Sequence, residues 1–404
     1  MVAATSPAPL DGILVLDFSQ FLAGPVAALR LADLGARVIK VERPLTGEIG
    51  RTLAFGGRWA DGDTLSFHAM NRNKEAVVAD LKDPADLARV RDLVARADVL
   101  IQNFRPGVME RLGLDHGSVS RLNPGLVYGS ASGYGDVGPW ADRPGQDLLA
   151  QSVSGLPWVS ATSERPLPVG LAVADHLMSC HLAEGITALL VRRARTGRGG
   201  LVETSLLEAM LDLQLELVTA RLNGQDPAAG TTLSRGHRLR PPPYGVHPTA
   251  DGHLAIASVP VDRLGRLLDS EDLAAYDDPA TWEQHRGEIE RLLAEVLERS
   301  TTDHWLALLE RAGVACAPVI TLEELLVHPA FEAIGMVQQV ERPAREPGGP
   351  PVRLMTTRSP IRLDGEALVH GGAAPRLGAQ GRLADGADPL AGSGHEAGAG
   401  SGSG

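Results

Sequence analysis

Residues 12–42 read GILVLDFSQFLAGPVAALRLADLGARVIKVE, and the pattern within them sets the class of fold. The apolar run 12–18 is typical of a short buried strand. A helical pattern opens at Pro25, where proline is favoured as a first helical residue, and ends at Gly35, which suits a helix C-cap. The run at 37–42 predicts a second strand. A strand, a helix and a strand within about thirty residues form a βαβ unit, whose two strands are parallel.

The same alternation continues toward the C-terminus. An amphipathic helix is predicted at 84–97, and the glycine-rich sequence SGYGDVGP at 132–139 follows the last strand pattern. The further strand patterns lie at 76–81, 99–104 and 126–132. The sequence therefore predicts a doubly wound, mostly parallel α/β sheet of the Rossmann-like kind.

The later part of the chain indicates a second, smaller domain. A long helical pattern at 205–222 precedes the Gly-, Pro- and Arg-rich stretch 224–243, which lacks periodicity and is expected to be loop. A strand at 253–259 and helices at 289–299 and 302–311 predict an α+β domain. The expected organisation is 1–204 as the N-terminal part of the large domain, 205–223 as a linker helix, 224–325 as the small domain, 326–390 as a return linker and the C-terminal part of the large domain, and 391–404 as a disordered tail.

Composition narrows the choice of partners and compartment. The chain has 38 Lys and Arg against 50 Asp and Glu, a net charge of -12, which argues against nucleic acid because phosphate backbones need surplus basic side chains. Two cysteines, Cys180 and Cys316, make no disulfide framework and fit a reducing cytoplasm. The N-terminus lacks the features of a signal peptide, and no stretch is apolar enough to span a membrane. We therefore expect a cytoplasmic protein with no membrane partner.

The first turn between strand and helix is where an open α/β sheet binds its ligand. Here the turn reads SQFLAGP at 19–25, which is not the G-x-G-x-x-G of a dinucleotide site, although Glu42 stands where a ribose-binding acid would. The P-loop pattern and Cys/His metal motifs are also absent from the sequence. We therefore expect neither NAD nor a metal.

Basic residues cluster near the predicted strand ends. Singly, each is typical of a solvated surface, but together they could surround a phosphate-bearing ligand with a shared positive field. The cluster consists of Lys40, Arg43, Arg72, Lys74, Arg105 and Arg111.

Asp175, in GLAVADHLMSC, stands at a predicted helix start and has two interpretations. As a helix N-cap it would accept hydrogen bonds from free backbone N–H groups. As an ionised carboxylate near a helix N-terminus it could attack an activated acyl group. Its neighbour His176 points about 100° away around the helix, so the two side chains cannot face each other, and we interpret His176 as structural.

An ordered series of motifs resembles the family III CoA-transferases, a group that includes the 2-methylacyl-CoA racemases. The series spans about 11–210, with a weaker PTADGHLAIA at 248–257 and a similar TTRSPIRLDGEA at 356–367. The motifs are LDFSQFLAGP (16–25), LGARVIKVERP (34–44), NRNK (71–74), NFRPGVMERLG (103–113), SGYGDVGP (132–139), GLAVADH (170–176) and RTGRGG (195–200).

The resemblance implies an acyl-CoA:carboxylate CoA-transferase in which Asp175 is the catalytic carboxylate, with coenzyme A and its acyl thioesters as substrates. It also implies a homodimer of two interlocked, ring-like chains. Without a metal, Asp175 would form an acyl anhydride and then an aspartyl-CoA thioester. The residues that match the CoA-contacting segments of the family are Arg43, Asn71, Arg72, Lys74, Asn103, Phe104 and Arg111.

Three positions of the expected substrate pocket differ from relatives. Gln146, beside Asp147, stands where racemases have a histidine, and an amide cannot take a proton. Leu22 replaces a glutamine of the formyl-CoA transferases, and Arg240–Tyr244 (RPPPY) stands where they have a glycine run, which favours a larger or more apolar acyl group. A racemase or epimerase and a non-catalytic CoA-binding protein remain as alternatives.

Overall fold

The computed structural model describes residues 8–53, 55–159, 165–225, 236–237, 239–346 and 348–391. These residues form two compact units. The large unit takes its chain from 8–154, 170–213 and 335–391, and the small unit from the described residues of 155–169 and 214–334. Residues 392–404, nearly all of the predicted disordered tail, lie outside the described residues.

The large unit is built on a six-stranded sheet in the order β5-β2-β1-β6-β7-β8, with every neighbouring pair parallel. The strands are β1 (Leu14–Asp17), β2 (Arg37–Glu42), β5 (Glu75–Val78), β6 (Val99–Gln102), β7 (Val127–Ser132) and β8 (Gly200–Ser205). The predicted α/β fold with a mostly parallel sheet is confirmed. The chain builds outward from β1 to β5 and then returns to the other side of β1 with β6, so the order reverses between β1 and β6. Ligands of open parallel sheets bind at such a reversal.

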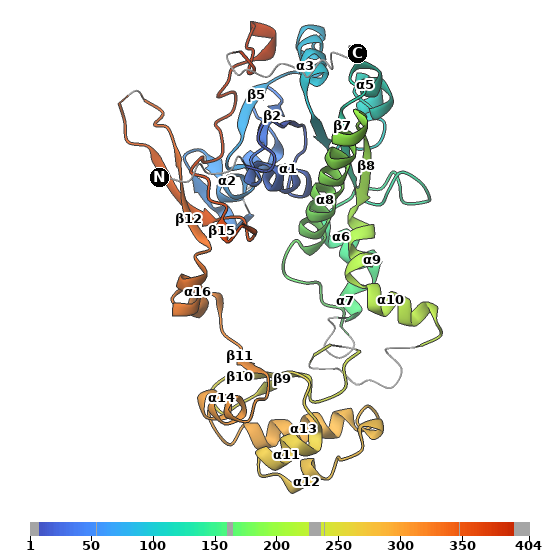
Figure 1. Ribbon diagram of the computed structural model, residues 1–404, viewed down its shortest axis with the longest axis vertical. Helices are drawn as coiled ribbons and strands as arrows, with labels where there is room; N and C mark the ends of the chain where they lie inside the picture. The colour runs from blue at the N-terminus through green and yellow to red at the C-terminus, as the bar shows by residue number, and fades with distance from the viewer. Residues whose placement is uncertain are drawn as a thin grey trace. The chain divides into compact units, whose positions relative to one another are not determined.

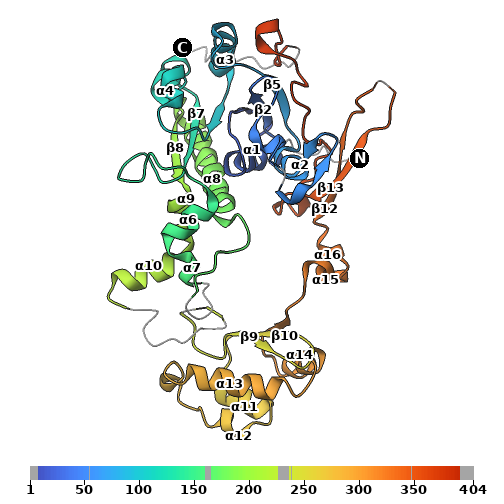
Figure 2. The ribbon, with the colours of Figure 1, turned by 180° about the vertical axis from the view of Figure 1, so that it is seen from behind.

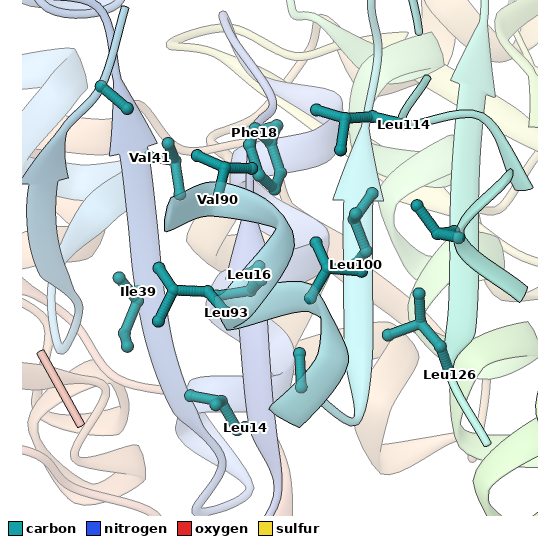
Figure 3. Close-up of a cluster of buried hydrophobic side chains, with 14 of the residues drawn as sticks. Leu14, Leu16, Phe18, Ile39, Val41, Val90, Leu93, Leu100, Leu114 and Leu126 are labelled. Carbon is teal, nitrogen blue, oxygen red and sulfur yellow. The ribbon is translucent and has the colours of Figure 1, made fainter. Parts of the chain in front are cut away.

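One face of the sheet carries the apolar core drawn in Figure 3. Leu14, Leu16 and Phe18 point to this face because alternate residues of a strand share a side. Helix α3 (Pro84–Arg96) covers it with Val90 and Leu93, which lie one turn apart and are almost fully buried. The apolar runs of the sequence therefore become a continuous core.

The other face is covered by α1 (Ala23–Asp33) and α8 (Val173–Thr196), which pack against each other (Figures 1 and 2). Helix α8 also runs along β7 and β8. At Gly129 of β7, an added Cβ would lie 3.0 Å from Ile186 Cδ1 of α8. The missing side chain thus lets the helix approach the strand closely.

The C-terminal segment is tied to the N-terminal part by arginine–carboxylate pairs. It contains the hairpin β12 (Val337–Arg342) and β13 (Val352–Thr357), visible in Figure 2. The Arg342 guanidinium lies 2.9 Å from a carboxylate oxygen of Asp61 and 2.9 Å from one of Asp63. Arg376 adds a contact of 2.7 Å to Asp61. Breaking such buried pairs is costly, so the ends of the chain hold together as one unit.

The segment 205–223, predicted as one linker helix, contains two helices. Helix α9 (Leu206–Leu213) belongs to the large unit and α10 (Leu215–Leu222) to the small unit. Gln214 between them has φ -98° and ψ 18°, outside helical geometry. The sequence pattern alone did not indicate this break.

The small unit has an antiparallel sheet in the order β11-β10-β9 and a helical layer. Its core includes Leu254, Leu293 and Trp305. The elements are β9 (Gly245–Pro248), β10 (His253–Ile256), β11 (Cys316–Pro318), α11 (Val261–Leu267), α13 (Arg286–Leu297) and α14 (Thr302–Arg311). No helix in the described part of the chain combines the length and apolar character that a membrane crossing needs.

Candidate active site

The turn that joins β1 to α1 lies at the sheet reversal and is held by side chains from two other segments of the chain. The Gln20 N–H donates to Asn103 Oδ1 at 2.9 Å, and Asn103 Nδ2 donates back to the Gln20 carbonyl at 2.8 Å. The next N–H, that of Phe21, donates to Glu48 Oε2 at 3.1 Å. Phe21 has a φ of 65°, which a bulky residue rarely adopts. The surrounding hydrogen bonds stabilise this turn against that cost.

A buried cluster of charges lies beneath the turn. Lys74 Nζ donates to Asp17 Oδ2 at 2.8 Å and also to the Pro25 carbonyl and to Asn71 Oδ1. Lys40 Nζ donates to the Ser19 carbonyl at 2.8 Å and lies 3.5 Å from Asp17 Oδ2. All three charged side chains are inaccessible to solvent. The cluster fixes β1 to the start of α1.

The pKa values of this cluster follow from its burial and pairing. Burial disfavours the ionised form of Asp17, but Lys40 and Lys74 outweigh that effect and hold the pKa of Asp17 below its ordinary value. Burial lowers the pKa of Lys74 to about 8, against the opposing attraction of Asp17. Both lysines therefore act as buried partners of Asp17 that stabilise the fold.

Asp175 lies in the first turn of α8, facing the start of α1. Its carboxylate faces the backbone N–H of Ala23, the first residue of α1, and this N–H favours the ionised form. The side chain is half-buried. Burial first, and then the negative charge of Asp147, raise the pKa of Asp175 to about 7. This carboxylate therefore changes its protonation state near neutral pH.

Asp147, the first residue of α6 (Asp147–Ser154), binds the N-terminus of α8. Its Oδ1 accepts from the N–H groups of Ala174 at 2.7 Å and of Asp175 at 3.3 Å. Gln151 Nε2 donates to the other carboxylate oxygen of Asp147 at 2.5 Å. Helix α8 is thus capped by Asp147, and Asp175 lies inside the helix. No sequence pattern indicated this contact.

The predicted CoA-contacting residues fall into two groups. Asn71, Lys74 and Asn103 use their side chains in the contacts described above, and Arg72 makes a buried bidentate pair with Asp33, with Nη2 2.8 Å from Oδ2. The other group lies nearer to solvent. It consists of the half-buried Phe104 and the exposed Arg43 and Arg111, joined by the exposed Arg105 of the wider basic cluster.

The exposed arginines stand at the carboxyl ends of strands beside β1. Arg43 directly follows β2, and Arg111 is on α4 (Val108–Leu112), which follows β6. Arg43 Nε donates to the Gly47 carbonyl at 2.7 Å. No ion pair of Arg43 or Arg111 occurs among the described residues. These guanidinium groups are therefore available for an anion, unlike Arg72 and Lys74.

Leu22, Gln146 and Asp147 were expected in a substrate pocket. Leu22 is half-buried and precedes Ala23, so its backbone adjoins the contact with Asp175. Gln146 is exposed at the start of α6. Glu48 and Asp17 were missed as site residues, although Asp17 carries a usable signal, an acid that ends a buried apolar strand. Among the described residues, no three His, Cys, Asp or Glu side chains gather as a metal site requires.

A parallel α/β unit with a half-buried carboxylate beside the sheet reversal is an arrangement suited to ligand binding. The chain matches the sequence model of CoA-transferase family III over residues 10–381. A succinate–glutarate CoA-transferase of Agrobacterium fabrum is 35% identical over 388 residues, covering 92% of this chain and 93% of that protein. An acetyl-CoA:oxalate CoA-transferase of Acetobacter aceti is 32% identical over 394 residues, covering 93% of this chain and 96% of that protein.

A solved structure also resembles this chain over nearly its whole length. The crystal structure of a CaiB/BaiF family protein from Brucella suis matches with a TM-score of 0.77 at 32% identity, covering 93% of this chain and 98% of that one. The chain belongs to CoA-transferase family III and is an enzyme of that family. Enzymes of this kind take CoA thioesters as substrates.

Proposed function

We propose that this enzyme transfers CoA from an acyl-CoA to a free carboxylic acid through covalent intermediates on Asp175. The observation that carries the proposal is the position of the Asp175 carboxylate, which is half-buried, faces the Ala23 N–H and has a pKa of about 7. At neutral pH a large fraction of this group is ionised, and an ionised carboxylate with few hydrogen-bond donors is a good nucleophile.

The proposed reaction balances without a metal or redox partner. The Asp175 carboxylate attacks the thioester carbonyl, a C–O bond forms, the C–S bond breaks and CoA thiolate leaves. The thiolate then attacks the aspartyl carbonyl of the anhydride, giving an aspartyl-CoA thioester and the free donor acid. The acceptor carboxylate repeats both steps in reverse order and regenerates Asp175. The Ala23 N–H supports a developing oxyanion on the aspartyl group.

The exposed arginines supply the CoA site. Arg43 and Arg111 flank the sheet reversal, and charge-assisted contacts to phosphate are among the strongest hydrogen bonds in proteins. Phe104 lies half-buried after β6 and offers an apolar surface. Asn71, Lys74 and Asn103 act at this site mainly by fixing the turn and the start of α1, and Arg72 pairs with Asp33 at the end of that helix.

We propose short dicarboxylic acids as donor and acceptor. The relatives described above are named for succinate and glutarate and for acetyl-CoA and oxalate. Succinyl and glutaryl groups also fit the expectation of an acyl group larger than formyl. Profiling CoA exchange from succinyl-CoA to acids from acetate and oxalate up to adipate tests this. Faster transfer to monocarboxylic acids than to succinate or glutarate would contradict it.

The covalent step is tested by mass spectrometry. Enzyme incubated with succinyl-CoA without an acceptor should carry CoA on the peptide that contains Asp175. Asp175→Ala should lose the adduct and the transfer while binding CoA within a few-fold of wild type. Asp142→Ala is a matched control, since Asp142 is an exposed acid five residues before Asp147. A racemase would instead exchange the α-hydrogen of its substrate with solvent deuterium, and a non-catalytic CoA-binding protein would do neither.

We further propose the interlocked homodimer. Helix α10 and the short helices α15 (Leu322–Leu326) and α16 (Pro329–Ile334) have no buried residues. Leu222 is 81% exposed and Val327 84% exposed. Apolar side chains left in water on several helices support burial against another chain.

A further inference from the structure

The N-terminus of α8 is capped from another helix. Its own N-cap residue, Ala172, has no side chain that could cap it. The carboxylate of Asp147 takes this place and accepts from the N–H groups of Ala174 and Asp175 at 2.7 and 3.3 Å. Gln151, which is 1% exposed, holds Asp147 by one hydrogen bond and the Leu171 carbonyl by another at 3.2 Å. The position of Asp147 is therefore fixed on both sides.

This capping changes the surroundings of Asp175. An acid in the first turn of a helix is ordinarily stabilised by free N–H groups and the helix dipole, which lowers its pKa. Here Asp147 accepts from two of those N–H groups, and within the described residues the Asp175 carboxylate faces the Ala23 N–H. The pKa of Asp175 is accordingly raised, first by burial and then by the charge of Asp147.

We propose that Asp147 is a positioning residue whose negative charge, held against the N-terminal N–H groups of α8, keeps the ionised Asp175 nucleophile weakly stabilised and reactive. The proposal rests on the proposed function, because it assumes that Asp175 is the nucleophile. Asp147 is not itself the attacking group, since both of its oxygens are engaged by hydrogen bonds.

The arrangement favours the covalent intermediates. Two neighbouring carboxylates repel each other while both are ionised. When Asp175 becomes an anhydride or a thioester it loses its charge, and the repulsion by Asp147 disappears. An interaction that is unfavourable in the free enzyme and absent in the intermediate increases the driving force for acylation.

Other charged groups around this helix end act elsewhere. Arg30 of α1 acts on His176, whose pKa is lowered by burial and then by that arginine. Asp212 of α9 pairs with His181 of α8 at 3.2 Å. A substitution of Asp147 is therefore the direct test of what shifts the pKa of Asp175.

The test is Asp147→Asn, which keeps an acceptor oxygen for the Ala174 N–H and removes the charge. Asp142→Asn is the matched control, and Asp147→Glu restores the charge. The first readout is infrared titration of the carboxyl band that disappears in Asp175→Asn. We expect its midpoint near pH 7 in wild type, at lower pH in Asp147→Asn, and back near the wild-type value in Asp147→Glu. We also expect a severalfold lower maximal transfer rate in Asp147→Asn with an unchanged KM for acyl-CoA.

Several results would overturn the proposal. If the titration midpoint does not move in Asp147→Asn, or moves equally in Asp142→Asn, the charge of Asp147 does not control the pKa of Asp175. If Asp147→Asn does not fold, the wild type still decides: a midpoint at or below about 4 would mean that the helix end stabilises Asp175. Absence of a CoA adduct on Asp175 in wild type would instead refute the proposed function, and the titration would then still report whether Asp147 controls Asp175.

Discussion

Ionising Asp175 should cost folding stability, and Asp175→Asn should recover it. The pKa of this carboxyl is about 7 in the folded protein against an ordinary 3.8. Below pH 4 the group is protonated in both states, so the substitution should change little. Between pH 4 and 7 the unfolded chain releases the proton and the folded protein keeps it, so wild-type stability falls as pH rises. A shift of about three units corresponds to roughly 4 kcal/mol, fully developed above pH 8.

The assay is the melting temperature of wild type, Asp175→Asn and the control Asp142→Asn from pH 4 to 9. At roughly 2–4 °C per kcal/mol, the Asn variant should melt about 8–16 °C above wild type at pH 8, and the two should melt at nearly the same temperature at pH 4. Mass measurement after each run checks that the amide has not reverted to Asp. A difference that does not vary with pH, or a wild type more stable at pH 8, would show that Asp175 is not held in this environment.

Other perturbations separate framework residues from ligand-binding residues. Arg43→Glu or Arg111→Glu should weaken CoA binding, measured by calorimetry, by about tenfold to a hundredfold, because a charge-assisted contact worth about 1.5–3 kcal/mol is lost. The melting temperature should not change. Unchanged CoA affinity in both variants would show that these arginines only contact solvent. Lys74→Met should lower the free energy of unfolding by about 3 kcal/mol in denaturant unfolding, because it leaves the buried Asp17 with one fewer partner. Lys82 is exposed, so Lys82→Met should cost little. An interlocked dimer should keep its mass in light scattering at nanomolar concentration, and a folded monomer would exclude it.

Much of the large unit could be predicted because its signals are local. The apolar runs at 12–18 and 37–42 became β1 and β2, and the helix predicted at 84–97 is α3, which begins at Pro84 after the cap Asp83. Strand β8 was missed, because its residues alternate between exposed and half-buried and follow a glycine-rich turn. The helix break at Gln214 was also missed, since glutamine is a good helix former and the buried position of its side chain is a tertiary effect.

The candidate site was harder to predict because its roles depend on distant partners. Asp175 was identified from its motif, but its cap, Asp147, lies 28 residues earlier and meets it only in the folded chain. From the sequence, both interpretations of Asp175 were open, a helix cap or a nucleophile. The structure gives the capping role to Asp147, and the Asp175 carboxylate faces the N–H of Ala23 instead.

The basic cluster divides into buried cations and exposed arginines, and the two groups differ in how far their charge acts. The buried cations lie beside acids, as Lys74 does with Asp17 and Arg72 with Asp33, so they produce little field beyond their immediate surroundings. An enzyme with a net charge of -12 must nevertheless attract an anionic cofactor. We propose that this attraction depends on the exposed arginines, because their charges are not cancelled by neighbouring acids; added salt should then weaken it. The motif NRNK holds its turn in place, and we propose that the exposed cations beside it meet the ligand.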